Sequence, residues 1–380
     1  MTAIAPGLQE NVVAANSVSE SSSNAYSAMI VDFPPWRTTI IGKLLARVSF
    51  SLFPVLPDIG ACAAFLTSKS VRERLRQADI VEIQWFEYFV FARLVKRVNP
   101  RAELIGFVHD VPSQRLERKT SGWPSLLSRP FLGYVAWLER VILRALPKAM
   151  VLSSKDAVLL AQRTSSTRTI VVNPPLDPGE PSATARKLAL QPTPAATTSQ
   201  AFGFIAAFQR PENEDAALWL LSEIWPSVLA RCPSALLYLV GSKPSPRLQR
   251  AAREIGDSVI VTGYVEDLDS YYNKFETVII PLRHGAGVKF KTLSGILAGK
   301  NIVATSVGIE GTLSADYFFR VTDSAHELAQ AMAELAADPS VGIDIRERAR
   351  RHVGSRYSLD NYARSVVAAY FPGTTPREVE

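Results

Sequence analysis

The C-terminal half of the chain alternates short apolar runs with longer amphipathic segments, and this alternation constrains the fold more than any other feature. β-branched and aromatic residues fill the short runs, which is typical of buried strands. The segments between them carry apolar residues at helical spacing. Strands that alternate with helices predict parallel βαβ units, and therefore a doubly wound α/β domain. The apolar runs are AFGFIAAF, ALLYLVGS, VIVTGYV, TVIIPL and NIVAT.

The N-terminal half follows the same alternation, with strand-like runs at DIVEIQW (residues 79–85), AELIGFVHDV and AMVLSS. The chain has 380 residues, which suits two domains of about 150 to 200 residues each. We therefore predict two Rossmann-like α/β domains. The first 28 residues lack the basic and apolar regions of a secretory signal, so we expect a disordered leader there. The predicted segments are the leader (1–28), the N-terminal domain (29–175), a linker rich in Pro, Ala, Ser and Thr (176–200), the C-terminal domain (201–355) and a last helix (356–372).

The net charge of +6 belongs to the N-terminal half. Residues 1–180 contain 21 Lys and Arg against 15 Asp and Glu, and the two signs balance at 21 each in the remainder. A basic excess of this kind indicates either an anionic partner or a solvated surface, and both interpretations stay open. Cys62 and Cys232 match no metal or redox spacing, which favours a reducing, cytoplasmic setting.

One apolar segment of the N-terminal half, WRTTIIGKLLARVSFSLFPVLPDIG (residues 36–60), allows two interpretations. Arg37, Lys43 and Arg47 interrupt it before it reaches the ~18 to 20 apolar residues of a membrane span. It could lie in a membrane interface with its cations toward the headgroups. We favour packing inside the domain, because the apolar face of a helix more often faces a core.

Several motifs of the C-terminal half, in order and spacing, resemble the nucleotide-sugar domain of GT-B fold glycosyltransferases, especially retaining family 4, the glycosyl transferases group 1. Together with DIVEIQWFE and VHDV in the N-terminal half, the resemblance covers about residues 79–371. The motifs are RPENEDAALWLLSEIWP, LYLVGSKP, VTGYVEDL, VIIPLRHGAGVKFKTLSGILAGKNIVATSVGIEG and RYSLDNYARSVVAAYF.

The resemblance implies two domains that face each other across a cleft, with the acceptor on the N-terminal side and the last helix crossing back to that domain. It implies transfer of a sugar, typically a hexose, from a nucleotide sugar to a hydroxyl acceptor, with retention of configuration. The acceptor could be lipid-linked and reached at an anionic membrane through the basic helix that ends at Lys148, or it could be a soluble metabolite. We expect no nucleic-acid partner, no cofactor and a cytoplasmic enzyme, either free or on the inner face of the membrane.

The donor residues follow from the resemblance position by position. Arg210 matches the arginine that contacts the diphosphate, although a surface arginine is the plain alternative. Gly285 and Gly287 allow the backbone to approach a ligand closely. Lys289 and Lys291 begin the next helix, where a nearby anion would relieve the repulsion between lysines and the helix N-terminus. The remaining donor-binding candidates are Gly241, Gly263, Tyr264, Val265, Ala286 and Ser294.

The sequence departs from the family pattern at three of these places. The two family glutamates, eight positions apart, are replaced by Ala286 and Ser294, and the family lysine on the helix after Arg210 is replaced by Ala216. We expect Ser294 to retain a weaker contact with the ribose, and Lys289 or Lys291 to replace the missing lysine. A catalytically degenerate GT-B binding subunit is the main alternative, and a sugar-nucleotide epimerase has less support.

Two candidate catalytic residues follow a strand of the N-terminal half. His109 matches a family histidine that faces the donor sugar, and Asp110 would orient His109, bind acceptor hydroxyls or cap the next loop. Asp267 and Asp269 resemble a metal-binding acidic pair, but they lie in a βα turn, where an N-cap is the better interpretation. We therefore expect no metal.

Overall fold

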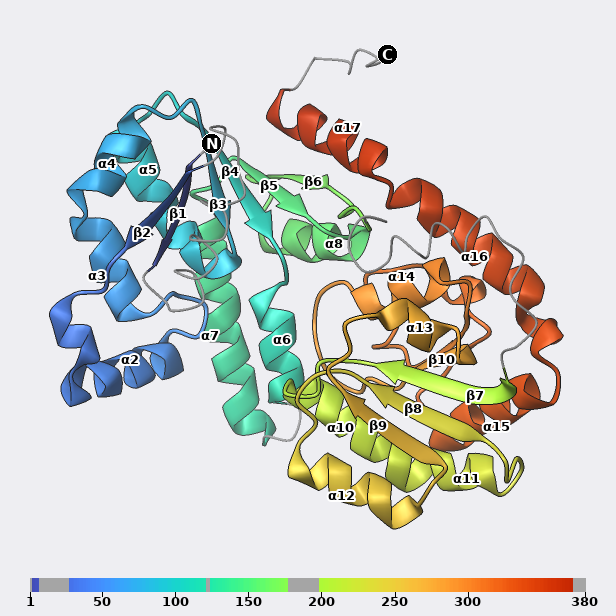
Figure 1. Ribbon diagram of the computed structural model, residues 1–380. Helices are drawn as coiled ribbons and strands as arrows, with labels where there is room; N and C mark the ends of the chain where they lie inside the picture. Colours follow the sequence, from blue (N-terminus) through green and yellow to red (C-terminus); the bar gives the residue numbers. More distant parts are fainter. Residues whose placement is uncertain (1, 7–26, 121–123, 177–197, 372–380) are drawn as a thin grey trace. The chain divides into compact units, whose positions relative to one another are not determined.

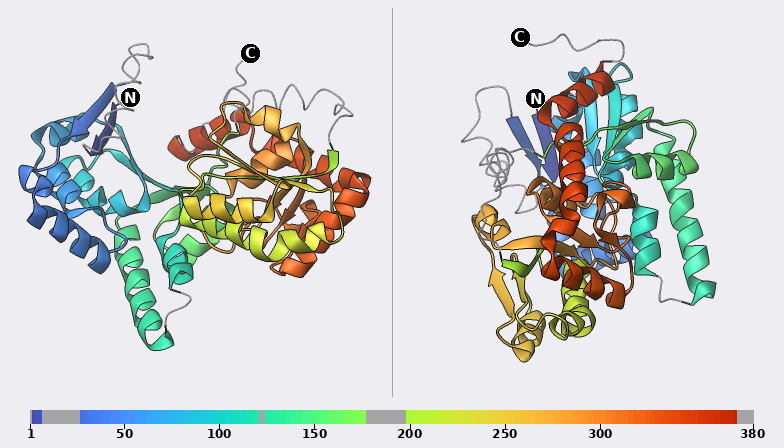
Figure 2. Two further views of the ribbon diagram at one scale, coloured as in Figure 1. Left: turned by 60° about the horizontal axis from the view of Figure 1, so that its bottom comes forward. Right: turned by 90° about the vertical axis from the view of Figure 1, so that its right-hand side faces the viewer.

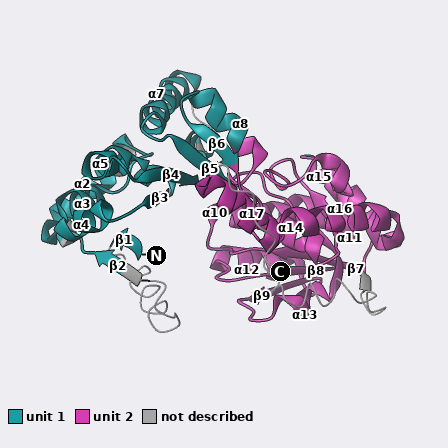
Figure 3. Ribbon diagram, turned by 90° about the horizontal axis from the view of Figure 1, so that it is seen from above, with its two compact units in different colours: residues 1–151, 157–170 teal, residues 152–156, 171–380 magenta. Residues whose placement is uncertain are grey.

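The computed structural model describes residues 2–6, 27–120, 124–176 and 198–371 (Figure 1). The chain divides into two compact units (Figure 3). Unit 1 contains residues 1–151 and 157–170, and unit 2 contains residues 152–156 and 171–380. The predicted linker lies almost entirely outside the described residues.

Unit 2 is built on a six-stranded parallel sheet in the order β12-β11-β10-β7-β8-β9. From β7 the chain moves outward to β8 and β9, returns to β10 beside β7, and moves outward again on the other side. This is the doubly wound order that the alternation predicts, with its switch point between β7 and β10. The strands are β7 (Thr198–Ile205), β8 (Leu236–Val240), β9 (Val259–Gly263), β10 (Phe275–Ile280), β11 (Asn301–Ala304) and β12 (Arg320–Val321).

The helices of unit 2 cover this sheet and bury one large apolar core. Helices α10 to α12, coloured yellow-green to yellow, lie together along one side of the sheet (Figures 1 and 2). Elsewhere α11 packs on α15, and α14 packs on α16. The bounds are α10 (Pro211–Trp219), α11 (Trp225–Leu229), α12 (Pro246–Ile255), α13 (Leu268–Tyr272), α14 (Phe290–Leu297), α15 (Ala325–Ala337), α16 (Ile343–Arg356) and α17 (Leu359–Tyr370), with short 3₁₀ helices at Ala315–Tyr317 and Pro339–Gly342.

One helix that the sequence predicts as continuous is interrupted. A π-helical turn, Leu220–Ile224, joins α10 to α11. Pro226 explains the break, because it has no N–H to donate to the carbonyl of Ser222. The last helix, α17, belongs to unit 2, and its predicted return to the N-terminal domain stays a prediction.

Unit 1 contains a four-stranded parallel sheet in the order β3-β4-β5-β6. A separate parallel pair, β1 and β2, corrects one expectation, because part of the predicted disordered leader forms a strand in register with residues 27–31. The rest of that leader lies almost entirely outside the described residues. The strands are β1 (Thr2–Pro6), β2 (Ser27–Val31), β3 (Ile80–Gln84), β4 (Glu103–Val108), β5 (Lys148–Val151) and β6 (Arg168–Val171).

Side-chain caps begin three of the unit 1 helices. Thr39, Asp58 and Ser68 accept hydrogen bonds from backbone amides in the first turns of α2, α3 and α4. The helices are α2 (Ile40–Leu52), α3 (Ile59–Thr67), α4 (Lys69–Arg76), α5 (Ala92–Val98), α6 (Pro112–Lys119), α7 (Ser125–Leu143) and α8 (Ser154–Arg163), with 3₁₀ helices at Pro35–Thr38 and Phe86–Phe91.

The preferred interpretation of residues 36–60, packing inside the domain, is wrong for α2. This helix buries the small residues Gly42 and Ala46 and leaves its large apolar side chains in solvent. Ile40 is 87% exposed, Ile41 71% and Leu44 60%. Apolar periodicity specifies which face of a helix is hydrophobic, but it does not specify what covers that face. None of the helices in the described part of the chain has the length and hydropathy that crossing a membrane requires.

Candidate functional site

Two helices of unit 2 begin beside each other at the switch point of the sheet. β7 leads through a short loop to Arg210, the N-cap of α10, and β10 leads through residues 281–288 to Lys289, the N-cap of α14. Neither N-cap makes a side-chain hydrogen bond to its own helix. Helix N-termini carry partial positive charge and present backbone N–H groups, so this position suits an anion. Ligands of doubly wound sheets bind at such switch points.

Lys291 reaches from α14 across to α10. Its ammonium donates to Asn213 Oδ1 at 2.5 Å and lies 5.2 Å from the centre of the Phe204 ring. Asn213 is itself held by the carbonyl of Ala207, to which its amide donates at 2.8 Å. The first turns of α10 and α14 are therefore joined through one partly buried polar contact.

The electrostatics around Lys291 are those of a cationic cluster. Burial, together with the smaller effects of the charges of Lys289 and Arg210, lowers the pKa of Lys291 to about 7, and Glu212 opposes the shift. Three cationic side chains thus lie near one another where two helix N-termini begin. Like charges repel one another, and Glu212 offsets part of this repulsion, so an anion that binds beside the three cations would be attracted to the cluster.

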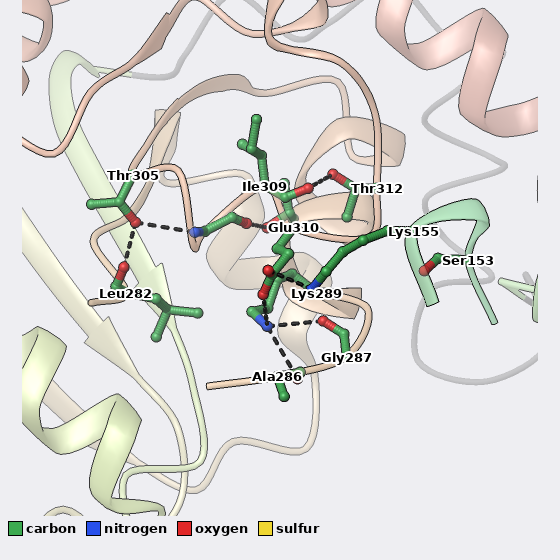
Figure 4. A network of polar contacts seen from close by, with 12 residues as sticks. Ser153, Lys155, Leu282, Ala286, Gly287, Lys289, Thr305, Ile309, Glu310 and Thr312 are labelled. Atoms are coloured by element: carbon green, nitrogen blue, oxygen red, sulfur yellow. Dashed lines mark hydrogen bonds and ion pairs between the residues drawn. The ribbon is translucent and has the colours of Figure 1, made fainter. Parts of the chain in front are cut away.

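Lys289 is fixed inside the turn that follows β10. Its ammonium donates to the carbonyls of Ala286 at 3.1 Å and Gly287 at 2.8 Å. Glu310 Oε2 lies 3.6 Å from the same ammonium, and Glu310 Oε1 pairs with Lys155 in the first turn of α8, within the residues that group with unit 2 (Figure 4). One carboxylate therefore lies between two lysines, and it holds the loop after β11 against the turn after β10.

The backbone of these turns is closely packed. Gly285 has φ +120, a conformation that L side chains rarely adopt, and it lies in the turn that Lys289 closes. Gly241, at the end of β8, has φ +146, and a Cβ there would lie 1.8 Å from the carbonyl oxygen of Ala206. Both glycines are therefore required by the path of the chain. Thr305 joins the turns after β10 and β11, since its hydroxyl accepts from Gly308 N at 3.0 Å and donates to the carbonyl of Leu282.

The predicted donor residues fall into two groups. Arg210, Lys289 and Lys291 lie together at the switch point with the turn Gly285–Gly287, and half-buried Ser294 lies in the middle of α14. The others lie farther along the same edge of the sheet. Gly241 N donates to Gly263 O at 3.1 Å, and the Tyr264 side chain that follows is 75% exposed. Val265 is half-buried beside it, next to the edge strand β9.

Sequence reasoning missed several polar residues at this edge. Glu310 and Asn213 are more than 90 positions apart, and each reaches a predicted lysine only through the fold. A second pair was also missed, because Arg283 donates to both carboxylate oxygens of Asp215, at 3.0 and 2.6 Å. The only available signal was the acidic residue within the GIEG turn.

In unit 1, His109 lies just past the end of β4. Its Nε2 is 2.7 Å from Gln84 Oε1, and its ring stacks on Trp85 with centroids 4.1 Å apart. Burial lowers the pKa of His109, and the charges of Asp110 and Glu87 oppose that shift. The lowered pKa favours a neutral imidazole at pH 7.

Trp85 was not predicted as a site residue. Its backbone adopts φ +69, and its indole is 51% exposed although it stacks on His109. The backbone N–H of Trp85 donates to the carbonyl of Phe107 at 3.1 Å, and this bond fixes the end of β3 against β4. Positive φ in a bulky residue costs of order 1–3 kcal/mol and persists only where surrounding contacts enforce it.

Asp110 is engaged in an ion-pair network. Arg115 donates to Asp110 Oδ2 at 3.0 Å and to Glu87 Oε1 at 2.9 Å. Burial raises the pKa of Asp110, and Arg115 opposes that shift. Val111, rather than Asp110, is the N-cap of α6, and no side chain caps that helix. The sequence predicts Asp110 as one residue that would orient His109. In the structure, the side-chain partner of His109 Nε2 is Gln84.

The acidic pair after β9 is a helix cap, as predicted. Asp267 Oδ1 accepts from Asp269 N at 3.0 Å and from Ser270 N at 3.3 Å. Within the residues that the structure describes, no group of three or more His, Cys, Asp or Glu side chains is arranged to hold a metal ion.

Comparison with known proteins matches part of unit 2 to a family model. Residues 199–338 match the family model described as Glycosyl transferases group 1. The structure of Anabaena Alr3699/HepE in complex with UDP and glucose has a TM-score of 0.58 and 13% identity, and the match covers 97% of this chain and 98% of that one. The chain has the GT-B fold. The predicted resemblance to GT-B glycosyltransferases and the predicted fold class are both confirmed, and the assignment to the retaining family 4 stays a prediction.

Two further matches cover less of the related protein. A mutant of S. aureus TarM, crystallised with Fondaparinux, alpha-GlcNAc-glycerol and UDP, has a TM-score of 0.56 and 10% identity over 83% of this chain and 59% of that one. An uncharacterized 44.6 kDa protein in the cps region of Klebsiella pneumoniae is 28% identical over 115 residues, 29% of this GT-B chain. The match spans 30% of that curated relative.

Proposed function

We propose that this GT-B protein is a metal-independent glycosyltransferase that moves a sugar, with retention of configuration, from a nucleotide sugar to a hydroxyl acceptor. The observation that carries the proposal is the cluster of Arg210, Lys289 and Lys291 at the switch point of unit 2. The family match over residues 199–338 contains all three residues. HepE and TarM were both crystallised with UDP, a nucleoside diphosphate of the kind that such a cluster would hold.

The cations would act on the leaving diphosphate. As the bond from the anomeric carbon to the diphosphate oxygen breaks, negative charge grows on that oxygen, and preorganised cations stabilise it. The acceptor oxygen forms the new bond to the same carbon on the same face, and its proton passes to the diphosphate. This route needs no carboxylate nucleophile, so the family glutamates missing at Ala286 and Ser294 do not preclude it.

Lys291 would replace the missing family lysine. That lysine would project from α10 at the position of Ala216, which is fully buried here. Lys291 projects from α14 instead, and its ammonium reaches Asn213, one turn earlier on α10. The ammonium of Lys291 on α14 can thus lie beside the N-terminal part of α10, from which the family lysine would project.

The two missing glutamates would change how the donor is held. A serine hydroxyl at position 294 can hydrogen-bond a ribose, but a neutral bond contributes about 0.5 to 1.5 kcal/mol against about 1.5 to 3 for a charged one. Ala286 offers only backbone to the donor sugar, and its carbonyl already accepts from Lys289. The donor would therefore be held mainly through its diphosphate.

The acceptor would bind at the carboxyl edge of the unit 1 sheet, where His109 and Asp110 lie. We propose a cytoplasmic protein without a cofactor or nucleic-acid partner, whose acceptor is either lipid-linked at an anionic membrane or soluble. The loss of both glutamates favours one alternative, a GT-B subunit that binds nucleotide without turnover.

Thermal unfolding with UDP, GDP, ADP and dTDP, followed by turnover of the matching nucleotide sugars, tests this proposal. A ligand that binds only the native state raises the Tm. We expect one base to raise it, Arg210→Ala to abolish the shift, and Arg351→Ala, an exposed arginine on α16, to leave it unchanged. Tight binding without hydrolysis or transfer, whichever sugar and acceptor class is offered, would support the degenerate subunit instead.

A further inference from the structure

Among the residues that the structure describes, exposed apolar side chains are concentrated on one helix of unit 1 and its flanks. Ten of the 22 exposed large hydrophobic residues lie between positions 36 and 66, and six of them belong to α2. In unit 2 the exposed hydrophobic side chains are scattered over several helices and loops. The six on α2 are Ile40, Ile41, Leu44, Leu45, Val48 and Leu52.

These side chains occupy one continuous face of α2. At the usual 3.6 residues per turn they span an arc of roughly 140°. Gly42, Ala46 and Ser49, which are buried or half-buried, lie on the next part of the circumference, toward the rest of unit 1. The described neighbours of α2 include α3 and the 3₁₀ helix before α2. The protein therefore covers the small-residue face of α2 and leaves the apolar face in solvent.

Two cations border the apolar face. Lys43 and Arg47 lie one turn apart, on the remaining edge of the helix, and both are exposed. No Asp or Glu occurs within α2. In Figure 1, α2 (blue) lies at the outer margin of unit 1, with no other element of that unit beyond it. An apolar face with cations along its edge matches a bilayer surface, where acyl chains lie below anionic headgroups.

We propose that α2 docks this protein on the surface of a membrane that contains anionic phospholipid. The charge pattern favours this partner over a second copy of the chain. A two-fold symmetric contact would place α2 on α2 and bring Lys43 and Arg47 of both copies to one interface without any acidic residue from the helix to neutralise them. The inference does not depend on the proposed catalytic function, because it concerns a separate surface.

Sedimentation with vesicles of phosphatidylcholine alone, or of phosphatidylcholine with 30% phosphatidylglycerol, tests the proposal. We expect the full chain to sediment with the anionic vesicles and to bind neutral vesicles at least tenfold more weakly. Raising the salt concentration should weaken binding to the anionic vesicles, because it screens Lys43 and Arg47. Failure of the wild-type protein to bind anionic vesicles would overturn the proposal.

Matched variants separate this helix from other exposed apolar residues. Leu44→Ser with Val48→Ser should reduce binding at least tenfold, and Lys43→Gln with Arg47→Gln should abolish the preference for anionic vesicles. Val341→Ser with Ile343→Ser, which changes two exposed apolar side chains of unit 2, should bind as the wild type does. These positions on α2 are exposed, so the Tm and circular dichroism should stay unchanged.

Trp36 and the oligomeric state provide two independent readouts. Trp36 lies just before α2 and is 38% exposed, so brominated acyl chains should quench its fluorescence, and Trp36→Phe should remove that quenching. Light scattering after size exclusion should give a monomer at every concentration tested. A dimer that becomes monomeric in Leu44→Ser with Val48→Ser would instead identify a second copy as the partner and would refute membrane docking.

Discussion

Glu310 lies 3.6 Å from the ammonium of Lys289, and both side chains are almost fully buried, with exposed fractions of 12% and 7%. The two residues belong to different loops of unit 2, one after β11 and the other after β10. Because Glu310 also pairs with Lys155, its carboxylate orients the lysine that lies nearest to the Gly285–Gly287 turn (Figure 4). The carboxylate of Glu310, which lies outside the Gly285–Gly287 turn, therefore helps to position that turn.

Glu310→Gln should destabilise the protein by about 3 kcal/mol, because it breaks a buried ion pair and removes the carboxylate that lies 3.6 Å from the ammonium of Lys289. Urea unfolding measures this change. Adding Lys289→Met should recover part of the loss, since the buried ammonium that Glu310 neutralises is then also absent, whereas additive losses would show that the two residues do not interact.

Donor affinity should depend on pH through Lys291. Its pKa in the native protein is about 7, so the ammonium that a diphosphate requires is lost as the pH rises above that value. Kd for the nucleotide sugar should rise by up to tenfold per pH unit between pH 7 and 9. Lys291→Arg keeps the charge throughout this range and should give a flat profile, which isothermal titration measures. A slope that persists in Lys291→Arg would assign the effect to another group.

The lowered pKa of Lys291 also predicts how the stability of the unliganded protein depends on pH. Between about pH 7 and the ordinary lysine pKa of 10.5, the unfolded chain holds a proton at Lys291 that the native protein lacks. The free energy of unfolding therefore rises with pH over this window, and below pH 7 the contribution is constant. Urea midpoints at pH 7 and 9 should show the rise in the wild type, and it should be smaller in Lys291→Met.

Arg210 should be needed for turnover more than for folding. Arg210→Ala removes an exposed cation at the N-terminus of α10 and should lower kcat/KM by about 10² to 10³, the effect of removing one preorganised group from a developing charge. Arg210→Lys should recover only part of the activity, because a lysine cannot contact two phosphate oxygens as a planar guanidinium does. Equal activity of Arg210→Ala and the wild type would refute the assignment.

The strands and the doubly wound order followed from local patterns. β10 and β11 are short apolar runs bounded by turn residues, and such runs can be recognised without knowledge of their partners. The contacts of the site could not be recognised in this way. Lys291 meets Asn213, and Lys289 meets Glu310, only because parallel strands bring their carboxyl ends to one edge of the sheet. Pair contacts between distant residues carry no local signal.

Helix α2 and strand β1 show two further properties that local sequence patterns do not predict. The sequence indicated an apolar helical segment within residues 36–60, but the choice between a core and a membrane interface rested on which is more frequent. The sequence of Thr2–Pro6 is too short and too weakly patterned to predict a strand, and its pairing with Ser27–Val31 depends on that distant segment. Exposure and pairing are properties of the surroundings of a segment rather than of its own residues.

Trp85 should control the protonation of His109. Trp85→Ala removes the stacked indole, exposes the imidazole and should raise the pKa of His109 toward its ordinary value, which proton NMR of the ring measures. Trp85→Phe retains an aromatic partner and should change the pKa less. If the pKa of His109 is the same in both variants and the wild type, burial by Trp85 is not the cause of the shift.

Ser294→Glu should restore a charged ribose contact and so tighten the binding of the nucleotide. Replacing a neutral hydrogen bond by a charged one adds about 1 kcal/mol, or roughly a fivefold decrease in Kd. Ser294 is half-buried in α14, so a glutamate can extend toward the ligand without filling the core. Ser294→Gln, which is similar in size but neutral, is the matched control. If both variants bind the nucleotide as the wild type does, position 294 does not face the ribose, and the residue-by-residue correspondence with the family along α14 is incorrect.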